Sequence, residues 1–292
     1  MGCISLLLAL NVVTTAPTPE GHVLARQAVP ATGVTRAESK VIYLEHNGAS
    51  LRPGDNDSSA GISSIVDRPT TIRAWDIDDD TWQATVDCMR EIYAPFDVTI
   101  TDEDPGDVPH IEAVFGGSPV DVGLPENVAG VSPFTEDCAI IERSIVFAFT
   151  DVMNDDPRTV CEVAAQEVAH SFGLDHELLA SDPMTYLPYV GERTFQDDMV
   201  SCGEYGNRMC GINGSVCRQR QNSFQLLAAR LGTRDLQSPT GDDGQADQLR
   251  SGVTSGCDAR GGTGRGIGLV ILVGHLAVRR RSRHRRPGAV LQ

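Results

Sequence analysis

The sequence predicts an α/β (α+β) domain with five strands, and two observations support this prediction. First, short runs rich in β-branched and aromatic residues are bounded by turn-forming residues, which is typical of strands. Second, two longer segments carry apolar residues at helical spacing. The expected strands are residues 41–44, 96–100, 110–115, 130–134 and 144–149, and the two main helices are residues 81–93 and 159–172.

The first expected helix has a clear start, end and buried face. Three aspartates at 78–80 precede it, and acidic side chains stabilise the positive end of a helix dipole. Trp82, Val86, Met89 and Tyr93 recur at helical spacing and are expected in the core. Pro95 ends the helix. A third, amphipathic helix is expected over residues 223–231, ended by a glycine.

Two of the strands differ in their expected place in the sheet. Residues 144–149 read Ser-Ile-Val-Phe-Ala-Phe, a nearly continuous apolar run that is typical of a central buried strand. Residues 130–134 contain Pro133, which lacks a backbone N–H and is tolerated at a sheet edge. We therefore expect 130–134 to be a short edge strand.

Composition limits the classes of partner. The chain has 292 residues, 40% of them hydrophobic, and a net charge of -16, which argues against a nucleic-acid partner. From Asp258 onward there are eight Arg and one Asp, a net of +7, so the preceding residues carry -16 - 7 = -23. An acidic body with a basic tail indicates two regions with separate roles. The acidic surface is expected to serve solubility.

The cysteines indicate an oxidising compartment. Of the eight, Cys3 and Cys257 lie in segments expected to be processed or anchored. The other six suit three disulfides, although sequence does not determine how they pair. Cys138 with Cys161 is the preferred pair, because both flank the strand that leads into the second helix. The remaining four are Cys88, Cys202, Cys210 and Cys217.

The two ends of the chain look like export and anchoring segments. The apolar run 4–13 is too short to span a bilayer and is typical of a signal peptide. We expect a signal peptide over 1–25, a linker or short propeptide over 26–40, the folded domain over 41–235 and a flexible linker over 236–256. Residues 257–292 hold a short apolar segment followed by an Arg cluster, which indicates a sorting tail or a membrane anchor with stop-transfer charges.

The chemistry of the chain centres on the second helix and the turn after it. Residues 166–176 read Gln-Glu-Val-Ala-His-Ser-Phe-Gly-Leu-Asp-His. Glu167 and His170 lie on adjoining turns of one helix, and Gly173 lets the chain reverse, which brings His176 back toward His170. A hydrolytic zinc site needs three protein ligands and an open position for water. A carboxylate beside it can take and deliver the proton.

A second motif follows at a fixed distance. Asp182-Pro183-Met184-Thr185-Tyr186 comes shortly after His176. Together, the two motifs resemble the metzincin metallopeptidases, whose signature is H-E-x-x-H-x-x-G-x-x-H followed by a Met-turn. In their details, the two motifs are similar to those of a set of exported myxobacterial proteins. The Gly256-Cys257 pair with its apolar and Arg-rich segments also resembles myxobacterial C-terminal sorting tails.

The metzincin resemblance implies a fold and a set of roles. It implies a twisted mixed five-stranded sheet, an active-site helix, a Met-turn at Met184 and a C-terminal helix. Zinc would be bound by Gln166, His170 and His176. Glu167 would be the general base and acid, and Tyr186 would stabilise the oxyanion. The edge strand at Gly130, Val131 and Ser132 would pair with an extended peptide or protein substrate.

Gln166 departs from the signature, because the family has a histidine there. Three interpretations stay open. Gln166 binds zinc through its amide oxygen, or zinc is held by the two histidines and another group, or the site is degenerate. His46 and His110 are the remaining candidates for a replacement ligand.

The sequence thus predicts a secreted, surface-anchored, monomeric zinc endopeptidase. The alternative is a catalytically degenerate binding module on the cell surface. A third hypothesis is a structural protein of the cell surface, whose main functional part is the C-terminal tail.

Overall fold

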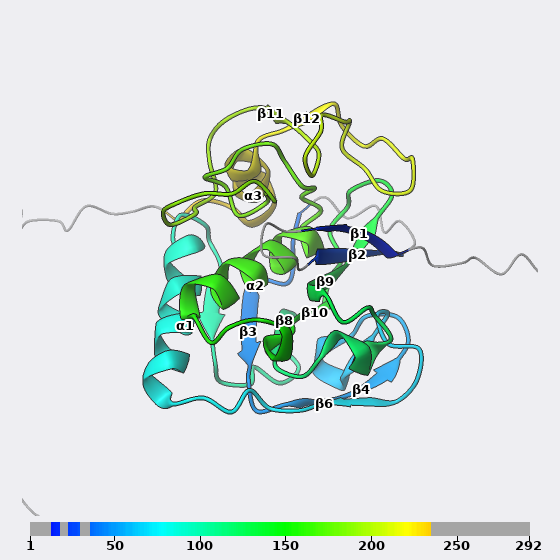
Figure 1. Ribbon diagram of the computed structural model, residues 1–292, viewed down its shortest axis with the longest axis vertical. Helices are drawn as coiled ribbons and strands as arrows, with labels where there is room; N and C mark the ends of the chain where they lie inside the picture. Colours follow the sequence, from blue (N-terminus) through cyan, green and yellow to red (C-terminus); the bar gives the residue numbers. More distant parts are fainter. Residues whose placement is uncertain (1–12, 18–22, 30–35, 235–292) are drawn as a thin grey trace, which may run out of the picture. The chain divides into compact units, whose positions relative to one another are not determined.

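The computed structural model describes residues 13–17, 23–29 and 36–234. These residues form an α+β domain around a mixed seven-stranded sheet, with strand order β1-β2-β9-β10-β8-β3-β7 (Figure 1). The predicted α/β (α+β) class with a mixed sheet is confirmed. The expected tail over 257–292, the linker over 236–256 and most of the expected signal peptide lie outside the described residues.

The five predicted strands are neighbours in this sheet, and two further strands extend it. From β10 to β7 all pairings are parallel, while β9 runs antiparallel to β10. The added strands come from the segment expected to be signal peptide and linker. The seven strands are β1 Val13–Pro17, β2 Val23–Val29, β3 Val41–Glu45, β7 Thr99–Thr101, β8 His110–Phe115, β9 Val128–Thr135 and β10 Ile145–Ala148.

Smaller elements complete the described part of the chain. A three-stranded sheet has the order β5-β4-β6, and a two-stranded ribbon pairs β11 with β12. Their bounds are β4 Ala49–Pro53, β5 Ile62–Ser63, β6 Thr70–Ile72, β11 Val200–Ser201 and β12 Arg220–Gln221. Three 3-10 helices span Ser58–Ala60, Pro119–Val122 and Thr150–Val152.

The three predicted helices are present; the ends of the first two are shifted by one to two residues, and the third has the predicted bounds. They are α1 Asp79–Ile92, α2 Pro157–Ser171 and α3 Ser223–Leu231. Each starts at a polar residue whose side chain accepts a hydrogen bond from a backbone N–H of the first turn. The caps are Asp78, Asp156 and Asn222.

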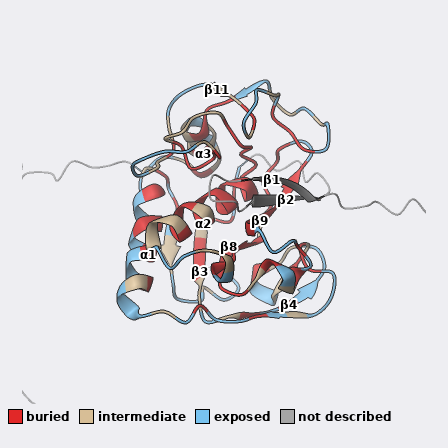
Figure 2. Ribbon diagram, viewed as in Figure 1, coloured by how far each residue is buried: buried red, intermediate tan, exposed pale blue. Residues whose placement is uncertain are grey.

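The sheet buries both of its faces (Figure 2). On one face, apolar side chains of α1 and α2 pack against alternate residues of the strands, such as Ile42, Leu44 and Ile111. On the other face, Val131 and Phe147 pack toward the small sheet that contains β4 and β6. α2 is therefore fixed against the middle of the sheet, and buried residues run along most of its length.

The edge position expected for residues 130–134 is wrong. β9 lies between β10 and β2, and all eight of its residues are buried. The neighbour is β2, which pairs in parallel with β9 and places Leu24 opposite Gly130 and Ala25 opposite Val131. The prediction relied on the missing N–H of Pro133. A strand that contains proline can still pair with a neighbouring strand through its carbonyl groups and its other N–H groups.

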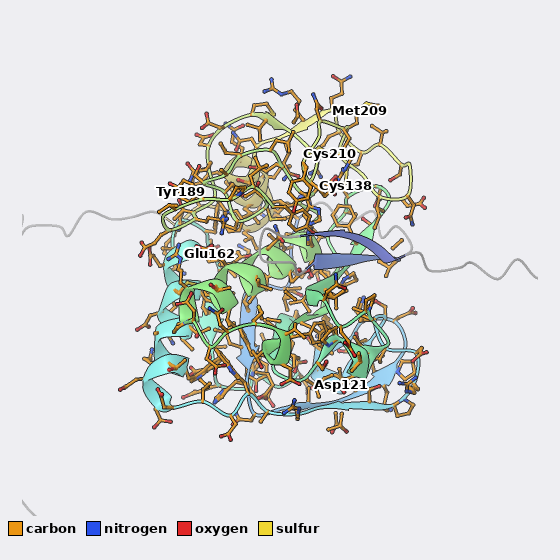
Figure 3. The ribbon with its side chains drawn as sticks, in the orientation of Figure 1. Asp121, Cys138, Glu162, Tyr189, Met209 and Cys210 are labelled. Carbon is orange, nitrogen blue, oxygen red and sulfur yellow. A yellow bond between two sulfur atoms is a disulfide. The ribbon has the colours of Figure 1, made fainter. Side chains whose placement is uncertain are left out.

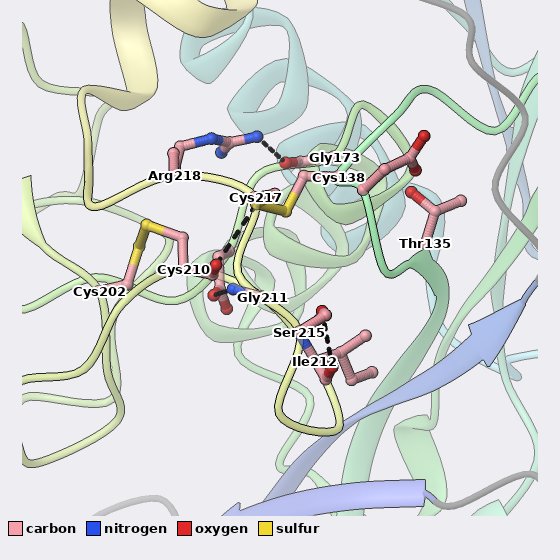
Figure 4. Close-up of a disulfide and its surroundings, with 12 residues drawn as sticks. Thr135, Cys138, Gly173, Cys202, Cys210, Gly211, Ile212, Ser215, Cys217 and Arg218 are labelled. Atoms are coloured by element: carbon pink, nitrogen blue, oxygen red, sulfur yellow. Dashed lines mark hydrogen bonds between the residues drawn. A yellow bond between two sulfur atoms is a disulfide. The ribbon is translucent and has the colours of Figure 1, made fainter.

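All six remaining cysteines form disulfides, but the preferred pair is wrong. The bonds are Cys88–Cys161, Cys138–Cys217 and Cys202–Cys210. Cys161 lies near the start of α2, whereas a Cβ placed on Gly173, past the helix end, would meet the Cys138 carbonyl oxygen at 2.2 Å. Twelve helical residues span about 18 Å, which is far beyond the reach of a disulfide. Figure 4 shows the two downstream disulfides close together.

In the described residues, no helix is long and apolar enough to cross a membrane. The apolar stretch at 266–278 that suggested an anchor is not among those residues.

Candidate metal centre

Helix α2 carries three of the predicted site residues, Gln166, Glu167 and His170. All three are almost completely buried, at 1%, 0% and 0% exposure. Residues three and four apart in a helix share a face, so Gln166 and His170 project in the same direction, with Glu167 beside them. The apolar residues between them pack into the core against the sheet and fix this orientation.

A tight turn after the helix returns the chain to the same place. Gly173 has φ +72°, a left-handed conformation that favours glycine. A side chain there would also collide with the Cys138 carbonyl oxygen and with Arg230. The N–H of Gly173 donates to the His170 carbonyl oxygen at 2.7 Å, and the N–H of Leu174 donates to that of Ala169 at 3.1 Å. The expected role of Gly173 in reversing the chain agrees with this geometry.

The two predicted histidines converge through their Nε2 atoms, which lie 2.9 Å apart. His170 Nδ1 donates to the Leu174 carbonyl oxygen at 2.7 Å, and His176 Nδ1 lies 3.0 Å from a Glu204 carboxylate oxygen. With each Nδ1 facing an acceptor, the Nε2 atoms are the ring atoms that face each other. Two nitrogen ligands of one tetrahedral zinc, at ~2.0–2.1 Å each, lie roughly 3.3 Å apart.

Gln166 is oriented by the turn that contains Pro183. Its Nε2 donates to the Pro183 carbonyl oxygen at 2.7 Å. A carbonyl can only accept, so the amide orientation is set, and Oε1 points elsewhere. Oε1 is buried and receives no hydrogen bond within the described residues. A buried amide oxygen without a donor is costly, and a cation would satisfy it. An amide oxygen and two imidazole nitrogens are all ligand types that bind a metal ion.

Glu167 lies against β9. A Cβ placed on Gly130 would come within 2.8 Å of Glu167 Oε1 and 2.9 Å of its Cγ, so the carboxylate touches the backbone of the strand. Gly130 thus allows the close approach that any larger residue would prevent. The side chain predicted to be general base and the first residue predicted to bind substrate are in direct contact.

The chain around Met184 forms a tight turn whose Met184 side chain is fully buried. Asp182 accepts a hydrogen bond from the Met184 N–H at 2.8 Å, and the Met184 carbonyl oxygen accepts from the Glu177 N–H at 2.8 Å. Tyr186 is 2% exposed, and its hydroxyl lies 3.0 Å from His176 Nε2. Tyr186 therefore belongs to the same cluster as the two histidines.

The carboxyl group of Glu177, next to His176, is kept neutral by its surroundings. Burial, with the negative charge of Asp182 nearby, raises the pKa of Glu177 to about 9. Its Oε2 accepts a hydrogen bond from Gln221 at 3.0 Å. The group adds no negative charge near the histidines at neutral pH.

The sequence did not reveal three charged residues that orient His176. Arg208 donates to both carboxylate oxygens of Asp175, at 2.5 and 2.9 Å, and to Glu204 at 2.6 Å. Burial raises the pKa of Glu204, but the hydrogen bonds from His176 and Arg208 outweigh it and hold that pKa well below its usual range. Glu204 lies 28 residues after His176, so only the tertiary fold brings them together.

Asp175, His176 and Glu204 each offer a ligand atom within 4.8 Å of the others. Arg208 binds both carboxylates of this group, and a guanidinium in that position repels a metal cation. A second group contains Asp175, Cys202 and Cys210, but these two cysteines are joined in a disulfide. Both groups thus favour a role in supporting His176.

The other candidates lie away from this cluster or are buried within the sheet. His46 stacks on Trp82 with ring centroids 4.0 Å apart, and His110 donates from Nδ1 to the Val108 carbonyl oxygen. Neither replaces a ligand. The side chains of Val131 and Ser132 are fully buried, so only the backbone of β9 could contact a peptide.

No protein-family model matches the chain, and no curated protein is significantly similar to it.

Proposed function

We propose that residues 41–235 form a zinc-dependent endopeptidase that is secreted and held at the cell surface. The observation that carries the proposal is the convergence of His170 and His176, whose Nε2 atoms lie 2.9 Å apart while each Nδ1 is fixed by an acceptor. Gln166 Oε1, buried without a donor, supplies a third ligand atom from the same helix. The metzincin-like motif and turn support the same assignment.

Bound zinc would supply Lewis-acid chemistry at this point, polarising the scissile carbonyl and lowering the pKa of a water molecule. Glu167 is placed to accept the proton of that water and to deliver it to the leaving amine. Its burial against Gly130 excludes bulk water and keeps the carboxylate close to the strand that would hold the peptide. The Tyr186 hydroxyl lies 3.0 Å from His176 Nε2, and from there it would stabilise negative charge on the substrate oxygen.

The substrate would be an extended peptide or protein segment paired with the backbone of β9. In the full chain, β2 occupies that side of β9. Removal of the proposed signal peptide, residues 1–25, would take away the residues opposite Gly130 and Val131 and leave Arg26 opposite Ser132. The proposed maturation thus frees backbone groups beside Glu167 for a substrate.

The second candidate is a surface binding module without activity, and the observation that favours it is Gln166. An amide oxygen is a weaker zinc ligand than an imidazole. Strand β9 would then bind a peptide without its being cleaved. In both cases the proposed tail over 257–292 anchors the protein, and the domain acts as a monomer.

One experiment separates the two. The secreted domain is purified, its zinc content is measured, and peptide hydrolysis is compared for wild type, Glu167→Ala and Gln166→His. We expect about one zinc per chain and an activity loss of ~10²–10⁴-fold in Glu167→Ala, because a general base is removed. Glu126→Ala, at an exposed glutamate, is the matched control and should leave activity unchanged.

Metal-free, inactive wild type would overturn the enzyme proposal, and gain of zinc and activity in Gln166→His would then identify a degenerate site. Zinc binding in wild type with activity unaffected by Glu167→Ala would overturn the role of Glu167.

A further inference from the structure

A polar cavity lies on the face of the sheet opposite to α2. Its floor is formed by Tyr43 and Glu45 of β3 and by His110 and Glu112 of β8. These residues alternate along the strands with those that pack under α1 and α2, so they point the other way. The walls come from β4, the 3-10 helix at 58–60 and the loop at 104–107, and the cavity measures about 250 Å³.

Glu112 is the decisive residue in this cavity. It is 7% exposed, and its carboxyl group receives no hydrogen bond from the described residues. Burial, with the negative charges of Glu45 and Asp104, raises the pKa of Glu112 to about 8. When ionised, a buried carboxyl group that lines a cavity without a donor can accept hydrogen bonds from a bound ligand.

The neighbouring charges make the cavity negative. Glu45 lies on the adjacent strand and accepts from the Tyr43 hydroxyl at 2.5 Å, while Asp104 lies at the exposed rim. Among the described residues that line the cavity there is no Lys or Arg. Arg143, which does not line the cavity, donates to two residues of its walls, Ser59 and the Asp107 carbonyl oxygen, each at 3.0 Å.

The spacing of the acidic groups distinguishes between kinds of cation. Within the described part of the chain, the groups of three or more side chains close enough to share one metal ion all contain Asp175, and none includes a residue of this cavity. A metal ion needs its ligands close together, whereas a guanidinium presents five donors spread over a plane. Carboxylates bind this group in pairs of parallel hydrogen bonds.

We propose that this cavity is a binding site for a guanidinium group, with Glu112 as its main acceptor and Glu45 and Asp104 as supporting charges. The site lies on the far face of the sheet from Glu167 and the two histidines, and it is independent of the proposed peptidase activity. The guanidinium belongs either to an arginine side chain of a polypeptide or to a small free molecule.

The test is a calorimetric titration of the full chain with N-acetyl-arginine amide and, separately, with methylguanidine. At pH 9, above the raised pKa of Glu112, its carboxylate is ionised while the guanidinium keeps its charge. We expect binding with a stoichiometry of one at this pH, weakened about 10–100-fold in Glu112→Gln because a charged acceptor is lost. Asp104→Asn, at an exposed position, should fold normally and weaken binding about 2–5-fold. Glu126→Gln, an exposed charge elsewhere, should leave it unchanged.

Tighter binding of N-acetyl-arginine amide would assign the site to arginine side chains, and equal binding of methylguanidine would assign it to a small molecule. Absence of binding by both probes would overturn the proposal. So would an affinity that Glu112→Gln and Asp104→Asn both leave unchanged, or calcium binding that Glu112→Gln abolishes, since the site would then serve a metal.

Discussion

The sheet region, residues 36–172, and the downstream region, residues 173–222, each supply half of the candidate metal centre, but they are held together differently. The sheet region is regular, and its two faces are covered by apolar cores. The downstream region has only the two-residue strands β11 and β12 as regular strand structure. It is held by disulfides and by hydrogen bonds between charged side chains. One of the disulfides, Cys138–Cys217, ties it to the sheet region, and Cys138 lies close to Cys210 in Figure 3.

The difference is clearest in the buried carboxyl groups. Glu112 of the sheet region has no hydrogen-bond donor among the described residues, and its pKa is raised. Glu204 of the downstream region accepts hydrogen bonds from His176 and Arg208, and its pKa is held well below the usual range. The first group opposes folding when ionised, and the second supports it. The two regions should therefore respond to pH in opposite directions.

The largest expected effect is the pH response of Glu112→Gln. The folded-state pKa of about 8 lies above the ordinary value of 4.5, so wild type loses stability as pH rises through this interval. The glutamine variant lacks this loss. At ~1.4 kcal/mol per pKa unit, the variant should equal wild type near pH 4.5 and exceed it by up to about 5 kcal/mol above pH 8. Urea unfolding at several pH values measures the difference.

Glu126→Gln removes the same charge at an exposed site and should show no such pH dependence. Parallel stability curves for wild type and Glu112→Gln would contradict the raised pKa.

The next effect separates the two kinds of stabilisation through the disulfides. Replacing Cys88 and Cys161 by serine opens a loop of 73 residues between α1 and α2 and should lower the free energy of unfolding by ~4 kcal/mol. Replacing Cys202 and Cys210 opens a loop of 8 residues and should lower it by only ~2.5 kcal/mol. Only the second pair lies in the region that orients His176, so only its loss should weaken zinc binding. Chemical unfolding and zinc titration measure the two quantities.

Equal loss of zinc affinity in both double variants would show that the metal centre depends on overall stability alone, and the proposed division between the regions would be wrong.

The smallest effect is that of Glu204→Gln, which keeps the shape of the side chain and removes its charge. A partner that orients a metal-bound histidine typically contributes 10–100-fold to affinity, so we expect zinc affinity to fall by about that factor. Wild type retains the Glu204 contribution down to low pH because the pKa is depressed, and loses it only as pH falls through that value. Zinc titration with a competing chelator, with Glu192→Gln at an exposed position as control, measures the effect.

Much of the sheet region could be predicted because its signals are local. Helix α1 follows from acidic residues before an amphipathic segment. Outside this region, α3 follows from an amphipathic segment ended by a glycine. The five expected strands are present and adjacent in the sheet. The spacing of apolar residues along the chain indicates which side chains are buried, and this local pattern is sufficient to identify both helices and strands.

The errors share one physical cause, since pairing between distant segments leaves no local signal. Residues 130–134 looked like an edge strand, yet β2 pairs beside them from a segment more than a hundred residues earlier. Cys138 and Cys161 flank one strand in the sequence, yet Cys161 lies near the start of helix α2 and Cys138 lies beyond its end, and each pairs with another cysteine.

The sequence by itself determined the composition of the candidate site. Gln166, Glu167, His170, Gly173, His176, Met184 and Tyr186 were all identified from spacing and resemblance, because a helix and a tight turn impose fixed distances. The tertiary structure alone decided what surrounds them. Glu204 reaches His176, and Arg208 holds Glu204 in place. Pro183 orients Gln166, and Gly130 admits Glu167, only through the packing of separate segments. Contacts of this kind depend on side-chain geometry in three dimensions, which no local pattern encodes.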